Sequence, residues 1–167
     1  MSKKKEIGES IFEKLFEKNG YKIIAPEKLT IEEQAYLVYN CKMLASLEGT
    51  LAHNVVFAKK DTLQIILRKQ SEIIPRQIML NQITSTRVIY IDVYNELFKG
   101  FPISHDRGPF LLMWNENIDR FITDFGYESI SVGTASYLKN LFIYCIKCFF
   151  FIFKHKVKNI CTKFFLW

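Results

Sequence analysis

A chain of 167 residues is long enough for one domain of ordinary size and too short for two large ones. Its 49% hydrophobic content excludes a disordered protein, and four cysteines are too few for a small disulfide scaffold, which favours a reducing compartment. The net charge of +6 is uneven, because residues 139–167 carry six lysines and no acid while the rest of the chain is neutral. A neutral body argues against a nucleic-acid-binding protein.

The first part of the chain predicts one helix and one strand. Its charged opening residues are unlike a secretory signal peptide, so we expect a cytoplasmic protein. Apolar residues then recur at helical spacing from Ile7 to Phe16, and Asn19 followed by Gly20 is typical of a helix end. Residues 21–26 predict a short strand that ends at a proline.

From residue 30 onward, strands and helices alternate with short connections. Thr30 with Glu33 three residues later is a capping-box pattern, which predicts a helix over 31–40. Pro75 is typical of the first turn of a second helix. The other expected elements are strands over 41–47, 62–69 and 87–94, and a short helix over 49–58 that starts at Gly49. This alternation predicts an α/β fold, a Rossmann-like, doubly wound parallel sheet with helices on both faces.

The remaining residues predict a loop, a long helix and a tail. Residues 95–109 are rich in turn-forming residues, and 110–126 fit one long amphipathic helix. We therefore divide the chain into one domain over 1–133 and an apolar, basic helical tail over 134–167.

Polar side chains gather in the otherwise apolar segment 45–57. The segment follows an expected strand, and ligands of open α/β sheets bind beyond the carboxyl ends of strands. Gly49 would let the backbone approach a phosphate, and free N–H groups in the next turn would favour an anion by about 0.3–1 kcal/mol. In the alternative interpretation, hydroxyl side chains only cap a helix and His53 is an ordinary core histidine.

The order of these motifs resembles glycosyltransferase family 61, a group that includes bacterial capsular-polysaccharide transferases. In that family, a strand that ends in a proline-containing turn precedes a helix with an acid and a glutamine, matched here by Glu33 and Gln34. A second strand then leads to a small-residue segment and a histidine-asparagine signature. The matching residues are Ser46, Glu48, Gly49, Thr50, His53, Asn54 and Phe57. The resemblance covers about residues 8–125 and is weak after the third strand.

The resemblance implies a GT-B architecture in which this chain is the C-terminal, sugar-nucleotide-binding half. Such an enzyme transfers a sugar to a glycan acceptor in capsular or lipopolysaccharide biosynthesis, with no obligatory metal and no cofactor. The implied donor contacts are Gln34 and Glu48 to hydroxyl groups, Gly49 and Thr50 to phosphate, and His53, Asn54 and Ser46 to phosphate or in support of the site. Arg68 and Lys69, at the end of the third strand, could neutralise the diphosphate.

The resemblance also implies that a complete enzyme carries an acceptor-binding half before the segment that begins near Ile7. The general base for the acceptor would lie in that half, so no catalytic residue is named. His105 and Asp106 form a candidate pair, but adjacent residues rarely face one substrate. The alternative function is a non-catalytic remnant or partner subunit docked on the membrane.

The tail predicts an amphipathic helix on a membrane surface. Its longest apolar runs are six residues on either side of Lys147, whereas a spanning helix needs about 20. Lys139, Lys147, Lys154 and Lys158 lie near one helical face. A helix of this kind lies in the interface of an anionic membrane, so we expect peripheral attachment to the cytoplasmic face.

Overall fold

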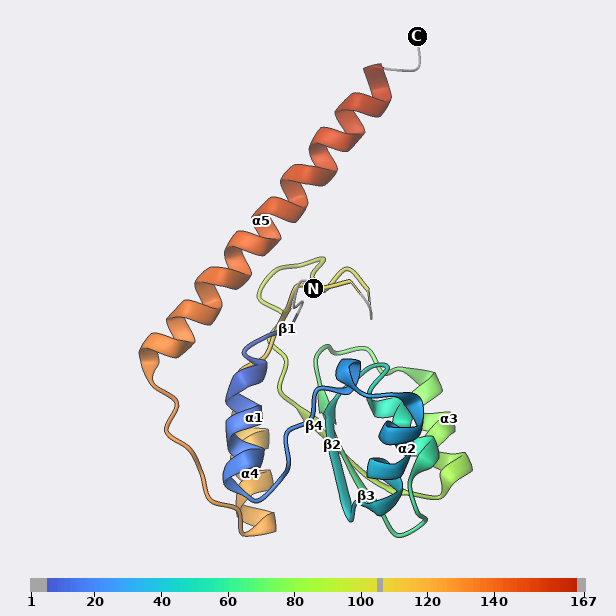
Figure 1. The fold of residues 1–167 in the computed structure, drawn as a ribbon. Coiled ribbons are helices and arrows are strands. Elements are labelled where there is room, and N and C mark those ends of the chain that lie inside the picture. Colours follow the sequence, from blue (N-terminus) through green and yellow to red (C-terminus); the bar gives the residue numbers. More distant parts are fainter. Residues whose placement is uncertain (1–5, 105–106, 165–167) are drawn as a thin grey trace.

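The computed structural model describes residues 6–104 and 107–164, with side chains described as far as Lys154 (Figure 1). Its larger sheet has three parallel strands in the order β2 (Met43–Leu47), β3 (Leu63–Arg68) and β4 (Arg87–Asp92). These bounds confirm three of the four expected strands. The fold is a mixed α/β arrangement with parallel sheets.

Helices cover both faces of this sheet, as expected (Figure 1). One face carries α1 (Glu9–Lys18) and α4 (Glu116–Phe125), and the other carries α2 (Ile31–Asn40), the 3₁₀ helix η2 (Ala52–Phe57) and α3 (Pro75–Thr84). On the first face, strands and helices share an apolar core. Its buried members are Ile11, Phe12, Leu15, Phe16, Ile65, Leu67, Ile91, Val93, Leu112, Ile118, Phe121 and Ile122.

The second face holds a buried polar cluster between β3, η2 and α3. Gln64 donates to the carbonyl oxygen of Ala52 over 2.7 Å, and its side-chain oxygen accepts from Asn81 Nδ2 over 2.6 Å. Gln77 Nε2 donates to Asn81 Oδ1 over 2.9 Å. Because a buried amide without a partner costs about 1–3 kcal/mol, these contacts fix α3 against the sheet.

A second, two-stranded sheet joins residues from distant parts of the sequence. β1 (Glu6–Ile7) pairs in parallel with β5 (Phe110–Leu111). Beyond β5, Met113 N donates to the carbonyl oxygen of Val93 over 2.8 Å, and Asn95 N donates to that of Leu111 over 2.9 Å. These antiparallel contacts connect the two-stranded sheet to the chain that leaves β4.

Helix α5 (Thr134–Phe164) runs along the two-stranded sheet and extends past it (Figure 1). Tyr144 and Cys148 are buried against β1 and β5, in a core cluster of Ile7, Phe101, Leu111, Met113, Tyr144 and Cys148. Within the described part of the chain, Thr134–Lys154 is the one helical segment long and apolar enough to cross a membrane, judged by length and composition alone. The helical, apolar tail is confirmed, while the domain division at residue 133 stays a prediction.

The strand expected over 21–26 is wrong. Residues 21–25 have no ladder partner, and Pro26 opens a short 3₁₀ helix, η1 (Pro26–Lys28). Ile23 and Ile24 are 43% and 39% exposed, so this stretch is not a buried strand. Tyr21 packs instead against Tyr127, just after α4, and the two hydroxyl oxygens lie 2.7 Å apart.

The helix expected over 110–126 begins six residues late. Residues Phe110–Leu111 are taken by the pairing with β1, which overrides their helical pattern. Asn115 then caps α4, because its side-chain oxygen accepts from the N–H groups of Asn117 and Ile118 over 3.1 and 3.3 Å.

Candidate functional site

The parallel strands bring four ionisable residues to one edge of the sheet. Glu48 follows β2, Arg68 ends β3 with Lys69 directly after it, and Asp92 ends β4. The N–H of Glu48 donates to the carbonyl oxygen of Leu67 over 2.9 Å, which carries the pairing one residue past β2. The carboxyl edge of an open parallel sheet is where such folds bind ligands.

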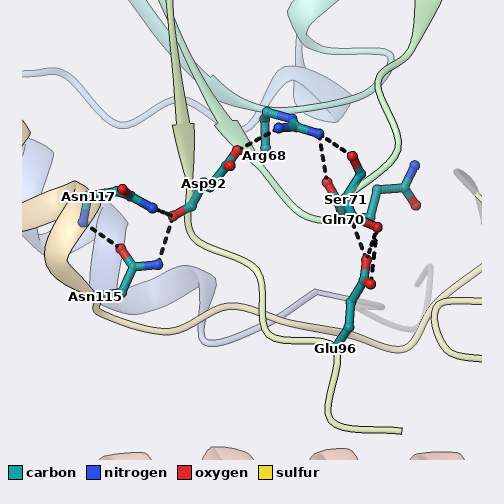
Figure 2. A network of polar contacts seen from close by, with 7 residues as sticks. All are labelled: Arg68, Gln70, Ser71, Asp92, Glu96, Asn115 and Asn117. Atoms are coloured by element: carbon teal, nitrogen blue, oxygen red, sulfur yellow. Dashed lines mark hydrogen bonds and ion pairs between the residues drawn. The ribbon is translucent and has the colours of Figure 1, made fainter. Parts of the chain in front are cut away.

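Arg68 is fixed by contacts on several sides (Figure 2). Its Nη1 lies 2.8 Å from Asp92 Oδ1, and its Nη2 donates to the carbonyl oxygens of Gln70 and Ser71 over 3.2 and 2.6 Å. The ring centre of Tyr94 lies 5.7 Å from the guanidinium carbon, and only 12% of the arginine side chain is exposed. Arg68 therefore organises the loop after β3, with most of its donors already used.

Two more sets of contacts tie the loops at this edge together (Figure 2). Ser71 donates its N–H and its hydroxyl to Glu96 Oε1, each over 2.8 Å, which joins the loops after β3 and β4. Asn115 and Asn117 donate to the carbonyl oxygen of Asp92 over 2.7 and 3.1 Å. The start of α4 is thereby attached to the end of β4, and the edge is a connected polar network.

Lys69 lies beside Gly49, the glycine that the sequence singled out. Lys69 Nζ is 3.1 Å from Glu6 Oε1 and 4.3 Å from the ring centre of Phe110. Gly49 has φ +135°, and a Cβ placed there would lie 3.6 Å from Lys69 Nζ. The structure thus brings an open backbone position and a cation together at the sheet edge.

Glu48 is a buried acid, 2% exposed, at the same edge. Burial raises the pKa of the Tyr90 hydroxyl; the Glu48 carboxylate raises it further, and the Arg68 guanidinium lowers it. The charges of Glu48 and Arg68 therefore both lie within electrostatic reach of Tyr90. This edge holds the carboxylates of Glu48 and Asp92, two cations and a phenol within one region.

Gln34 and Asn54 contact each other away from these charges. Asn54 Nδ2 donates to Gln34 Oε1 over 3.1 Å, and Gln34 Nε2 donates to the carbonyl oxygens of Pro26 and Leu29 over 3.1 and 3.3 Å. These bonds tie α2 to η2 and to the turn before α2. Contacts of the two amides with a donor stay predictions.

The helix expected to start at Gly49 is replaced by a turn and then η2, which starts at Ala52. The left-handed φ of Gly49 excludes it from a helix, and the N–H groups of Ala52, His53 and Asn54 donate three residues back over 3.0–3.2 Å. Fewer N–H groups are therefore free for an anion than at the α-helix N-terminus that the sequence predicted.

Three other predicted contacts lie around this turn. Thr50 is exposed, whereas Ser46 Oγ and His53 Nε2 are shielded and have no hydrogen-bond partner within the described residues. Burial, and then the positive charge of Arg76, lowers the pKa of His53. The imidazole is thus neutral near pH 7 and can offer a hydrogen bond but no charge.

Sequence reasoning missed several members of the edge network. They are Glu6, Ser71, Asp92, Glu96, Asn115 and Asn117. Asp92 ends an apolar strand and Asn115 precedes a helix, so the local sequence could have indicated a role for both. Nothing in the sequence around Glu6 or Glu96 indicates that they join this network. His105 and Asp106 lie outside the described residues. In the described part of the chain, no three His, Cys, Asp or Glu side chains gather as a metal site would require.

Comparisons with known proteins give one match. No curated protein and no solved structure matches the chain. The model of the family Glycosyltransferase 61 matches residues 5–66, a range that ends inside β3 and includes Glu48 and Gly49 but not Lys69. The resemblance expected from there to residue 125 stays a prediction. Over residues 5–66, the chain is therefore similar to the glycosyltransferase 61 family.

Proposed function

We propose that this chain is the sugar-nucleotide-binding part of a glycosyltransferase of the family 61 type. The family match over residues 5–66 indicates a glycosyltransferase and carries the proposal. The parallel sheet with helices on both faces supports its assignment to a Rossmann-like half of a GT-B fold. The proposed reaction moves a sugar from a sugar nucleotide to a glycan acceptor in surface polysaccharide biosynthesis.

In this proposal, the donor diphosphate lies against Gly49 and Lys69. The ammonium of Lys69 has three donors, of which Glu6 takes one, while Gly49 leaves room for phosphate oxygens close to the backbone. Negative charge grows on the diphosphate as the bond to the sugar breaks, and a fixed cation stabilises that charge. Arg68 supports the site by holding the loop after β3 in place.

Glu48 completes the proposed donor site. A carboxylate accepts hydrogen bonds from ribose or sugar hydroxyls, but both oxygens of Glu48 are shielded from solvent at the end of β2, so this contact requires a local rearrangement on donor binding. In this proposal, Lys69 neutralises the diphosphate, and we expect a reaction that needs no metal ion. The proposal names no general base.

A saturation-transfer NMR screen of the full chain against UDP-, GDP- and CMP-sugars tests this proposal. Lys69→Gln removes the cation and should weaken donor binding about tenfold, the loss typical of one charge-assisted hydrogen bond. Glu6→Gln is the matched control, because it breaks the same ion pair and leaves Lys69 in place. It should retain or strengthen binding. Equal loss in both variants would mean that the pair only supports the fold.

One observation favours the alternative of a non-catalytic remnant or partner subunit. Both cations of the edge already face carboxylates of the chain, Arg68 with Asp92 and Lys69 with Glu6. Because each cation already has a carboxylate partner, the edge needs no further anion. If the wild-type chain and Glu6→Gln both fail to bind every sugar nucleotide of the panel, the donor-site proposal is wrong.

A further inference from the structure

Helix α5 has two apolar faces. Tyr144 and Cys148 face the two-stranded sheet and are 1% and 3% exposed. The opposite face is bare, with Phe142, Phe149 and Phe153 66%, 67% and 58% exposed. The ring centre of Phe149 lies 6.4 Å from that of Phe153 and 6.3 Å from that of Phe150, so these rings form a continuous aromatic surface, and Phe142 lies about two turns earlier on the same side of the helix. Single exposed apolar residues are ordinary, but a continuous aromatic surface indicates a partner.

The charges beside this surface indicate what the partner is. Lys139 and Lys154 are both exposed and lie on one strip of α5, because the fifteen residues between them complete close to four turns of a helix. Glu128 is the last acidic residue in the sequence, so nothing acidic on α5 offsets these lysines. Exposed aromatic side chains beside a cationic strip fit the headgroup region of an anionic bilayer.

We propose that α5 lies in the plane of an anionic membrane surface while it remains packed on β1 and β5. The bare face inserts among the lipids, and the lysine strip lies at the level of the phosphates. The aromatic surface and the buried face point in opposite directions, so the helix can contact lipid and domain at once. The proposal stands independently of the sugar-nucleotide site.

The buried face explains why the helix lies in the plane. The middle of the segment Thr134–Lys154 is the part that packs against Ile7 and Leu111. A spanning helix would have to leave this core, expose its apolar residues to water and carry Lys147 into hydrocarbon. The in-plane arrangement requires none of these changes.

In-plane binding also locates the candidate site relative to the membrane. Phe98, in the loop that follows β4, stacks on Tyr144 with centroids 5.8 Å apart. The same loop carries Glu96, which is bonded to Ser71 at the sheet edge. The loop after β4 therefore links the edge network to the face of α5 that packs on the two-stranded sheet. With α5 on the membrane, this link would hold the edge network close to the bilayer.

Vesicle flotation of the full chain tests the proposal. The protein should float with phosphatidylcholine vesicles that contain phosphatidylglycerol, remain unbound with pure phosphatidylcholine, and be released by high salt. The triple variant Phe142→Ser, Phe149→Ser, Phe153→Ser should lose flotation. Its matched control, Tyr36→Ser, Met79→Ser, Ile83→Ser, changes equally exposed apolar residues on α2 and α3 and should float like the wild type.

A second pair of variants isolates the charge. Lys139→Gln with Lys154→Gln should lower partitioning about 25-fold, since each lysine near an anionic surface contributes about fivefold. Lys28→Gln with Lys60→Gln removes the same charge elsewhere and should change partitioning little. Circular dichroism and gel filtration confirm that every variant is folded. Deletion of α5 is avoided, because it would uncover Ile7 and Leu111.

Two results would overturn the proposal. Flotation with neutral vesicles that survives high salt and alkaline carbonate would show a spanning helix. A chain that does not float but forms a dimer, which the triple phenylalanine variant converts to a monomer, would show that a second copy covers the bare face.

Discussion

The three-stranded and the two-stranded sheet are specified by different kinds of contact. β2, β3 and β4 are runs of five or six residues, and β2 pairs with β3 and β3 with β4, in chain order. β1 and β5 are two residues each and pair across most of the sequence. The larger sheet is therefore encoded locally, whereas the smaller one depends on tertiary contacts with Gly8 and α5.

The largest expected effect concerns the link between β1 and α1. Gly8 has φ +97°, and a Cβ there would collide with the carbonyl oxygen of Leu112. Gly8→Ala should therefore lower the free energy of unfolding by about 4 kcal/mol, from backbone strain and overpacking together. Urea denaturation measures this.

Gly20 provides the matched control. It also has a left-handed φ, +83°, but no atom lies within 4 Å of the position of a Cβ. Gly20→Ala should cost only about 1 kcal/mol, the penalty of the backbone conformation alone. Equal losses at Gly8 and Gly20 would show that the close approach to Leu112 does not hold the two-stranded sheet in place.

The next prediction tests whether the two-stranded sheet and α5 can unfold while the larger sheet stays folded. Tyr144→Ala removes the largest buried side chain of α5 and should cost about 3 kcal/mol. Hydrogen exchange should show faster amide exchange in α5 and β5, while the amides of β3 keep their protection. Uniformly faster exchange throughout the chain would contradict the separation, because it would mean that both core clusters unfold together.

A smaller effect tests the polar face of the larger sheet. Asn81→Leu leaves Gln64 Oε1 without its 2.6 Å donor in a buried position, which should cost about 2 kcal/mol. The double variant with Gln64→Leu should recover part of that loss, since Gln64 Oε1 is then no longer a buried acceptor without its donor, while Gln77 Nε2 keeps the carbonyl oxygen of Ala52 at 3.4 Å. Additive losses in the double variant would show that the network contributes nothing as a unit.

The smallest effect is a pH dependence at His53. The pKa of His53 in the folded protein lies below the ordinary value of 6.5. The stability that the neutral imidazole contributes is therefore complete above pH 6.5 and is lost as the pH falls through the folded-state pKa. His53→Gln should flatten the decline in stability between about pH 7 and about pH 5, measured by urea denaturation. If the variant shows the same dependence of unfolding free energy on pH as the wild type, the His53 imidazole is solvated in the folded protein.

Local signals predicted the larger sheet and its helices well. The hydroxyl of Thr30 accepts from Glu33 N over 3.2 Å and the Glu33 carboxylate accepts from Thr30 N over 2.8 Å, so the capping box is present and α2 has the predicted bounds. Pro75 also opens α3 as expected. The segment 21–26 has the composition of a strand, but none of the strands in the described part of the chain pairs with it.

The candidate site was predictable in part. Gly49 and Lys69 were singled out separately, and the parallel register brings them together. Their surroundings could not be derived, because Glu6 reaches Lys69 only through the pairing of β1 with β5. The same holds for Glu96, whose bond to Ser71 depends on the path of the loop after β4.

The central claim is that a nucleotide diphosphate binds at the carboxyl edge of the larger sheet. Amide chemical shifts of the full chain, recorded during titration with the sugar nucleotide that binds best and with pyrophosphate, test it directly. The account predicts that the largest shifts occur at Gly49, Thr50 and Lys69 with both ligands. Shifts confined to the hollow lined by Trp114 and Tyr137, between the residues that follow β5 and the start of α5, would contradict it.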